Sequence, residues 1–180
     1  MRKNTKGISY VELVIVMGIL AALIGISSIS FSAAWRARAS KASNSVDALL
    51  SQSKINALSG EDNYIKILYR EKDTSRDINE SAYYAELYRV GSSTPYKSEN
   101  IGSGRLSILF GEGQTDIKQN KKAVLIKFNS KNGSVEYAGI EDISSSDTPA
   151  SAPDKTQIYF KFGNQYCVNL WRATGEHNIS

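Results

Sequence analysis

The N-terminal part of the chain contains its longest apolar run. Residues 13–26 read LVIVMGILAALIGI, and Glu12 is the only charged residue between Lys6 and Arg36. The wider segment 8–35 has 28 residues, which form about 42 Å of α-helix at ~1.5 Å per residue. Since the hydrocarbon core of a bilayer is about 30 Å thick, this pattern predicts a helix over 8–35 that can span a membrane.

The helical spacing continues beyond this run, but the composition becomes polar. From residue 36 onward the apolar or small positions recur every three or four residues and predict one buried stripe. Gly60 is a typical helix stop. One helix is therefore expected from Ile8 to Ser59, apolar in its first half and amphipathic in its second. The predicted stripe consists of Val46, Leu49, Leu50, Ser53 and Ala57.

After Gly60 the apolar positions alternate with polar ones, which is typical of β-strands. Asn132-Gly133 and Gly163-Asn164 are turn sequences, the latter a two-residue hairpin loop. Because most connections are short, we expect an antiparallel sheet with the long helix on one face, an α+β fold. The predicted strands are 64–70, 83–90, 105–110, 123–128, 134–140, 157–162 and 165–171.

Two polar stretches interrupt the strand pattern. Residues 144–155, SSSDTPASAPDK, and residues 71–81 are too polar to bury and are expected to be exposed loops. Acidic side chains around the first loop could supply oxygen ligands to calcium, but their spacing matches no defined calcium loop. A solvated acidic loop is the favoured interpretation, and no metal site is predicted. These acidic residues are Glu141, Asp142, Asp147 and Asp154.

Length and charge narrow the classes of function. A chain of 180 residues holds one ordinary domain and an N-terminal segment. Of the formal charge of +4, Arg2, Lys3 and Lys6 contribute +3, so the remainder of the chain is nearly neutral. No basic stripe follows from this distribution, and nucleic-acid binding is not predicted.

Catalytic and cofactor chemistry finds little support in the sequence. Cys167 is the single cysteine and His177 the single histidine, so an intrachain disulfide is excluded and a zinc site is not expected. Cys167 is predicted to pack as a small hydrophobic side chain. No combination of nucleophile, base and acid can be assigned. We predict that the chain is not an enzyme and has no cofactor.

Glu12 decides between three interpretations of the N-terminal segment. A cleaved secretory signal fits the basic start and the small residues 32–34, but not a carboxylate early in the apolar run. A simple membrane anchor leaves the same carboxylate unexplained. An ionisable residue at membrane depth costs about 2.5–3.5 kcal/mol and indicates a functional role with a charged partner. The third interpretation therefore requires a partner for Glu12.

The nine residues 6–14, KGISYVELV, supply such an interpretation. They resemble the cleavage and anchor motif of type IV prepilins and pseudopilins: a short basic leader ending in glycine, then phenylalanine, a small polar residue, two apolar residues, glutamate and a long apolar helix. The resemblance implies cleavage between Gly7 and Ile8 by a prepilin peptidase and N-methylation of Ile8. It also implies that Glu12 neutralises the terminal amine of a neighbouring subunit during assembly.

The resemblance is close but not complete. Ile8 stands where the family usually has phenylalanine, Tyr10 stands in place of leucine, and Ile29 lies near the position of a helix-kinking proline in many pilins. Weaker resemblances, over 49–67 and 165–179, point to the H-type minor pseudopilins of type II secretion and related minor pilins. Competence-type pseudopilins of Gram-positive bacteria stay open as an alternative.

The expected organisation follows from these observations. Residues 1–7 form a prepilin leader, 8–35 a transmembrane or filament-core helix, and 36–180 a globular domain. The resemblance implies as partners other pilin subunits, the prepilin peptidase, a membrane-embedded assembly platform and, before assembly, the lipid bilayer. It places the chain in the cytoplasmic membrane as a single-pass protein with its C-terminal domain outside, and then in a periplasmic or cell-surface filament.

Two other classes of function are kept as alternatives: a binding module on an uncleaved membrane anchor, and an exported enzyme whose chemistry is not visible. Four tyrosines gather in one region of the sequence, which would suit a binding surface. Sheet packing explains the same residues and is favoured. They are Tyr83, Tyr84, Tyr88 and Tyr96.

Overall fold

The computed structural model describes residues 9–72, 80–143, 155–162 and 164–180. The side chains of residues 24–35, 162, 164 and 165 are outside this description. The chain divides into two compact units, residues 1–35 and 36–180.

One long helix, α1, runs from Tyr10 to Leu58 over 49 residues. Gly60 has a φ of +91°, and its amide donates to the carbonyl of Ala57, while the amide of Glu61 donates to the carbonyl of Asn56. This pair of bonds is a Schellman motif with glycine in the left-handed conformation. It confirms Gly60 as the helix stop. The helix ends one residue before the predicted Ser59, and the predicted start, Ile8, lies outside the described residues.

The strands form two five-stranded sheets, and every pair of neighbours is antiparallel. The first sheet has the order β3-β2-β1-β6-β7 and the second β10-β9-β8-β4-β5. The first contains β1 (Asn63–Arg70), β2 (Ala82–Arg89), β3 (Lys97–Ser103), β6 (Lys122–Phe128) and β7 (Val135–Asp142). The second contains β4 (Ser107–Phe110), β5 (Thr115–Asp116), β8 (Lys155–Phe162), β9 (Asn164–Trp171) and β10 (His177–Ile179).

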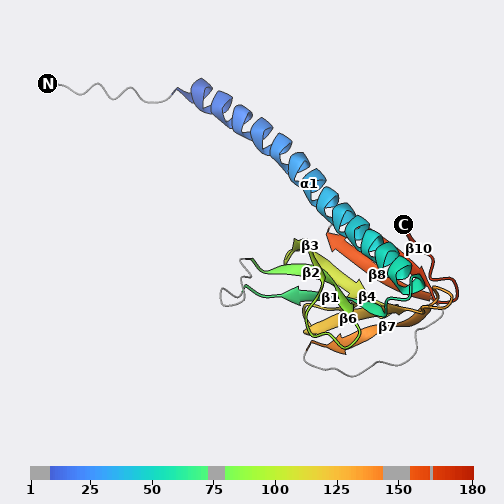
Figure 1. Cartoon of the computed structure of the whole chain (residues 1–180). Coiled ribbons are helices and arrows are strands. Elements are labelled where there is room, and N and C mark those ends of the chain that lie inside the picture. Colours follow the sequence, from blue (N-terminus) through green and yellow to red (C-terminus); the bar gives the residue numbers. More distant parts are fainter. Residues whose placement is uncertain (1–8, 73–79, 144–154, 163) are drawn as a thin grey trace. The chain divides into compact units, whose positions relative to one another are not determined.

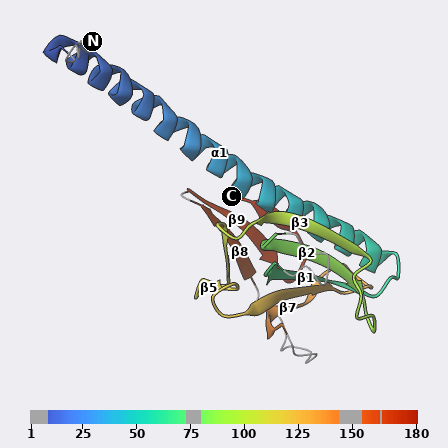
Figure 2. The same cartoon turned by 90° about the vertical axis from the view of Figure 1, so that its left-hand side faces the viewer.

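The second half of α1 packs on these sheets within the unit 36–180, as Figures 1 and 2 show. Its buried side chains belong to one hydrophobic cluster with side chains of both sheets. The predicted stripe is confirmed: all five of its residues are at most 1% exposed. From the first sheet the cluster takes Ile65, Ile67, Leu87 and Ile126, and from the second Ile108, Ile158, Phe160 and Val168.

The α+β prediction is confirmed, and all seven predicted strands are present, but two details differ. The strands belong to two sheets instead of one, and β3, β5 and β10 complete their edges. Asn164 already pairs with Phe162 as the first residue of β9. The connection after β8 is therefore shorter than the predicted two-residue loop, and Gly163 itself lies outside the described residues.

Candidate functional site

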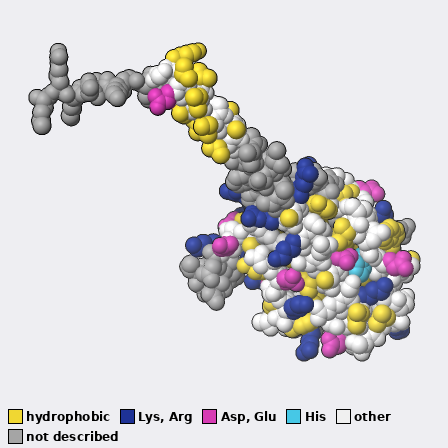
Figure 3. Space-filling view, turned by 90° about the horizontal axis from the view of Figure 1, so that it is seen from above, with side chains coloured by type: hydrophobic (Ala, Val, Ile, Leu, Met, Phe, Trp, Pro, Cys, Tyr) yellow, Lys and Arg dark blue, Asp and Glu magenta, His cyan; other side chains and the backbone are white. Residues whose placement is uncertain are grey.

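The first candidate site is the apolar segment, which we define as residues 10–23 of α1. Every described side chain in this range is exposed in the single chain, and hydrophobic side chains are visible along it in Figure 3. A helix that is apolar on all sides requires burial in lipid or in other protein. Its large apolar side chains, 48–80% exposed, are Tyr10, Val11, Leu13, Val14, Ile15, Val16, Met17, Ile19, Leu20 and Leu23.

Glu12 lies in the first turn of this helix. The first intrahelical bond of the segment joins the amide of Leu13 to the carbonyl of Ser9, at 3.1 Å. Unpaired amides and the helix dipole favour a carboxylate at this end. Glu12 is exposed and makes no hydrogen bond or ion pair within the described part of the chain. A charge partner for it must come from elsewhere if the segment is buried.

The predicted processing residues Gly7 and Ile8 lie outside the described residues, so cleavage and methylation stay predictions. Within the predicted membrane segment 8–35, the side chains of residues 24–35 also lie outside the described residues. Among the residues that are described, no helix is long and apolar enough to cross a membrane.

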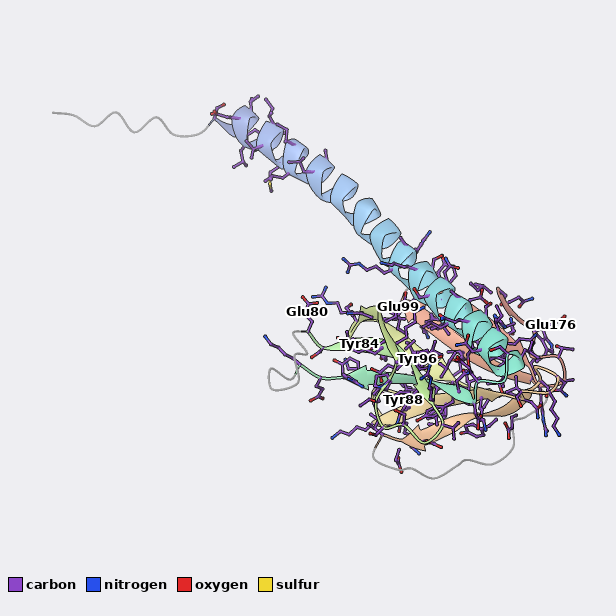
Figure 4. All side chains as sticks on the ribbon, in the orientation of Figure 1. Glu80, Tyr84, Tyr88, Tyr96, Glu99 and Glu176 are labelled. Carbon is purple, nitrogen blue, oxygen red and sulfur yellow. The ribbon has the colours of Figure 1, made fainter. Side chains whose placement is uncertain are left out.

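The predicted tyrosine group does not form one surface. Tyr83 is fully buried and belongs to the core cluster. Tyr84 and Tyr88, labelled in Figure 4, are one and five residues further along β2 and therefore lie on the opposite side of the strand. Tyr88 stacks on Tyr64 with ring centroids 5.2 Å apart, and burial raises the pKa of its hydroxyl. Tyr96, 40% exposed, lies beneath the guanidinium of Arg89. Sheet packing therefore accounts for most of the group.

A buried carboxylate that sequence reasoning missed lies beside these tyrosines. Glu86 of β2 is 0% exposed. Arg70 Nη2 is 2.8 Å from its Oε2, the Tyr88 hydroxyl donates to Oε2 at 2.6 Å, and Ser98 Oγ donates to Oε1 at 3.0 Å. Both oxygens of the carboxylate therefore have hydrogen-bond donors. The cluster stabilises the sheet and offers no free reactive group. In the sequence, Glu86 looks like an ordinary outward residue of a strand.

His177 comes close to a hydroxyl and a carboxylate, but not in a catalytic arrangement. Its Nε2 is 3.0 Å from Ser51 Oγ and 3.6 Å from Asp47 Oδ1, while Nδ1 faces the carbonyl of Gly175 at 3.4 Å. In a catalytic triad, the carboxylate orients the ring through the nitrogen opposite the nucleophile. Here one nitrogen faces both groups. The trio connects α1 to β10 and gives no indication of nucleophilic catalysis.

Cys167 is buried, at 7% exposure, as predicted. It lies on the side of β9 that also carries Asn169, whose Oδ1 is 3.8 Å from Sγ, and burial raises the pKa of the thiol.

Among the described residues no cluster of three or more histidine, cysteine or acidic side chains could hold a metal. Asp147 and Asp154 of the acidic loop lie outside them.

The chain matches no protein-family model and no curated protein. Two crystal forms of the type IV minor pilin FimU from Pseudomonas aeruginosa PAO1 resemble it in structure. One has a TM-score of 0.48 at 11% identity and covers 81% of this chain and 90% of its own. The other has a TM-score of 0.44 at 11% identity and covers 77% and 90%. At these values the likeness carries no argument about function.

Proposed function

We propose that this chain is the precursor of a pilin-like filament subunit, a minor pilin or pseudopilin. The observation that carries the proposal is the apolar segment: ten large apolar side chains are exposed around a single carboxylate, Glu12, at the first turn of the helix. The prepilin-like motif over residues 6–14 supports the same conclusion. The globular unit 36–180, with its own core, would be carried on the outside of the filament.

The energetics of the apolar segment favour assembly. Fully burying one large apolar side chain contributes about 1.5–3 kcal/mol. Ten such side chains make the exposed state of this helix unfavourable by an amount comparable to the stability of a whole domain. A bilayer satisfies this requirement before assembly, and a bundle of the same helices from other subunits satisfies it in the filament.

Glu12 would determine which part of the neighbouring subunit lies beside it in that assembly. A carboxylate in an apolar bundle is costly alone but tolerable beside a cation. Cleavage after Gly7 would create an amine at Ile8, four residues before Glu12 in the sequence. The amine of one subunit would then pair with Glu12 of its neighbour, and N-methylation of Ile8 keeps the positive charge.

The same proposal assigns a location and partners. The chain would be inserted in the cytoplasmic membrane by residues 8–35, with the basic leader 1–7 on the cytoplasmic side and the domain outside. A prepilin peptidase would remove the leader, and a membrane-embedded assembly platform would move the subunit into a periplasmic or cell-surface filament. The chain would take part as a structural subunit and not as an enzyme.

N-terminal sequencing and intact mass of the protein from producing cells test the processing step. The mature chain should begin at Ile8 and carry one additional methyl group. Gly7→Leu should leave the leader attached, whereas the matched control Lys6→Ala should be processed normally. A mature start near residue 34, or an intact Met1 in the unaltered protein, would reject the proposal in favour of a secretory signal or an uncleaved membrane-anchored binding module.

Assembly is tested separately with Glu12→Ala. This variant should be inserted and processed like the unaltered chain but should be strongly depleted from sheared filaments, because it leaves the neighbour's amine without a counter-charge. Glu61→Ala, which removes an exposed acid just beyond α1, is the control and should assemble normally. Equal incorporation of the Glu12→Ala and Glu61→Ala chains would disprove the pairing.

A further inference from the structure

A groove lies between the outer side of α1 and the hairpin of β9 and β10, entirely within the unit 36–180. Its volume is about 820 Å³, which is in the range of small-molecule sites. Asp47, Ser51 and Ile55 line it from the helix, and Trp171, Glu176 and Asn178 from the hairpin. We name it the hairpin groove; Glu176, one of its lining residues, is labelled in Figure 4.

The walls of the hairpin groove are fixed by contacts between distant parts of the chain. Lys54 Nζ donates to the carbonyls of Thr174 and Gly175, at 3.0 and 3.2 Å. His177 Nε2 lies 3.0 Å from Ser51 Oγ. A Cβ added to Gly175 would collide with the carbonyl oxygen of Gly133, so the turn packs directly against the connection between β6 and β7. A preformed site loses little entropy on binding.

The lining combines apolar surface with hydrogen-bonding groups. The Trp171 indole and the Ile55 side chain, 65% exposed, provide the apolar surface. Carboxylates of Asp47 and Glu176 accept hydrogen bonds, and the Asn178 amide can donate and accept. A ligand that matches these lining groups has one apolar face, for the indole, and hydroxyl groups around its edge, for the carboxylates and the amide. A pyranose ring has both.

The charges around the hairpin groove favour an uncharged group on the Trp171 indole. The Lys155 ammonium lies 5.5 Å from the centre of the Trp171 ring, so a cation brought to the indole would meet a like charge. An anion would meet the carboxylates of Asp47 and Glu176. The only lining cation besides histidine, among the described residues, is Lys54, which the hairpin carbonyls already engage. A neutral ligand avoids both repulsions.

We propose that the hairpin groove binds a neutral saccharide of one or two rings, stacked on Trp171 and hydrogen-bonded to Glu176 and Asp47. Such a site would give the subunit a recognition function that does not depend on assembly of a filament. Failure of saccharide binding would therefore leave the proposed structural role intact, and failure of assembly would leave this proposal intact.

The test uses the full chain in a detergent without a sugar head group. The sequence has two tryptophans, Trp35 and Trp171, so a Trp35→Phe background leaves Trp171 as the only reporter. Lactose, cellobiose, maltose and N-acetyllactosamine are titrated as neutral probes, with sialyllactose and trilysine as the anionic and cationic probes. A saturable change in Trp171 emission is expected with at least one neutral probe and with neither charged one.

Two variants then locate the binding by saturation-transfer NMR. Trp171→Phe, which keeps a smaller ring, should weaken binding about threefold or more, and Glu176→Gln about tenfold. Tyr96→Phe and Glu61→Gln are the matched controls away from the groove and should bind like the unaltered chain. Thermal unfolding of each variant shows that the fold is retained.

Three results would overturn the proposal. The first is the absence of a saturable response to all four neutral probes. The second is tighter binding of either charged probe than of any neutral one. The third is unchanged binding by both Trp171→Phe and Glu176→Gln, which would place the saccharide elsewhere. Loss of filament incorporation by these two variants without saccharide binding would identify the groove as a contact between subunits.

Discussion

The two halves of α1 have the same backbone structure but opposite relations to their surroundings. In residues 10–23, every described side chain is exposed. In the half from Arg36 to Leu58, the apolar side chains on one face are at most 1% exposed and pack on both sheets. The second half finds its partners inside the chain. The first half has the composition of a buried helix, and the proposed function assigns lipid and other subunits as its partners.

Two carboxylates show the same contrast on the scale of single residues. Glu86 is fully buried and has its cation, Arg70, on the neighbouring strand of the same chain. Glu12 lies among apolar side chains and has no partner within the described part of the chain. The paired carboxylate stabilises the fold, whereas the unpaired one has, under the proposed function, its role in assembly. Changing one half of α1 at a time separates the two roles.

The largest effect is expected from a matched pair of leucines. Leu50→Ala removes a side chain that is 0% exposed, and should lower the free energy of unfolding by about 2–5 kcal/mol because it leaves a cavity. Leu20→Ala changes a residue that is 48% exposed in the apolar segment, and should alter that free energy by less than about 0.5 kcal/mol. Denaturant unfolding followed by the near-UV signal of the domain measures both.

The comparison would be broken if Leu20→Ala destabilised the domain as much as Leu50→Ala. Such a result would mean that the apolar segment is part of the domain's own core. Conversely, only Leu20→Ala should weaken incorporation into filaments while leaving the unfolding transition of the isolated chain unchanged.

The second effect concerns the buried carboxylate. Arg70→Ala removes the cation of Glu86 but leaves the hydrogen bonds from Tyr88 and Ser98. We expect a loss of about 1–3 kcal/mol in the free energy of unfolding, because the charge then remains buried without its ion pair. The double change of Arg70→Ala with Glu86→Gln should recover part of this loss. Glu12→Ala is the control and should not move the unfolding midpoint of the single chain.

Much of the fold could be predicted because local patterns determine it. The buried stripe from Val46 to Ala57 follows from helical spacing. The helix stop at Gly60 follows from the left-handed conformation that a helix end requires and that glycine adopts easily. The division into two sheets could not be predicted, because alternation identifies a strand but not its partner. β3 was missed because Ile101 is its only buried apolar side chain and it lies at a sheet edge.

The candidate sites divide in the same way. Glu12 and the apolar segment were predicted because their signal lies in consecutive residues. The hairpin groove depends on contacts between residues far apart in sequence, such as Ser51 and His177. Glu86 was missed for a related reason: its burial arises from neighbours on β1 and β3, and a charged residue in a strand is normally exposed.

The third effect distinguishes two glycines of the same helix region. Gly60→Ala should destabilise the domain by about 1–2 kcal/mol, because φ is +91° there although no atom lies within 4 Å of the added Cβ. Gly18→Ala, inside the apolar segment and equally free of contacts, should instead stabilise the helix by about 0.5–1 kcal/mol. Denaturant unfolding measures the first change and far-UV circular dichroism of the full chain the second. Opposite signs are expected, and equal destabilisation would mean that Gly18 is closely packed within the chain.

The smallest effect is a dependence of stability on pH caused by Cys167. Burial raises the pKa of this thiol above its ordinary value. Below pH of about 8.5 the thiol is protonated in both the folded and the unfolded chain and contributes no pH dependence. Above that value the unfolded chain loses the proton first, so the folded state becomes relatively less stable. One pH unit higher, the loss is at most about 1.4 kcal/mol.

Cys167→Ala should therefore flatten the decline of stability between pH 8.5 and 9.5, as measured by denaturant unfolding at each pH. Tyrosines such as Tyr88, whose pKa burial also raises, add the same pH dependence to both proteins, so the difference between the unaltered chain and Cys167→Ala isolates the thiol. In the unaltered chain, alkylation of the thiol at pH 8.5 should be much slower than in the unfolded chain. Rapid alkylation of the folded chain, or an unchanged pH slope in Cys167→Ala, would show that the side of β9 carrying Cys167 is open to solvent, in contrast to the burial of this residue in the second sheet.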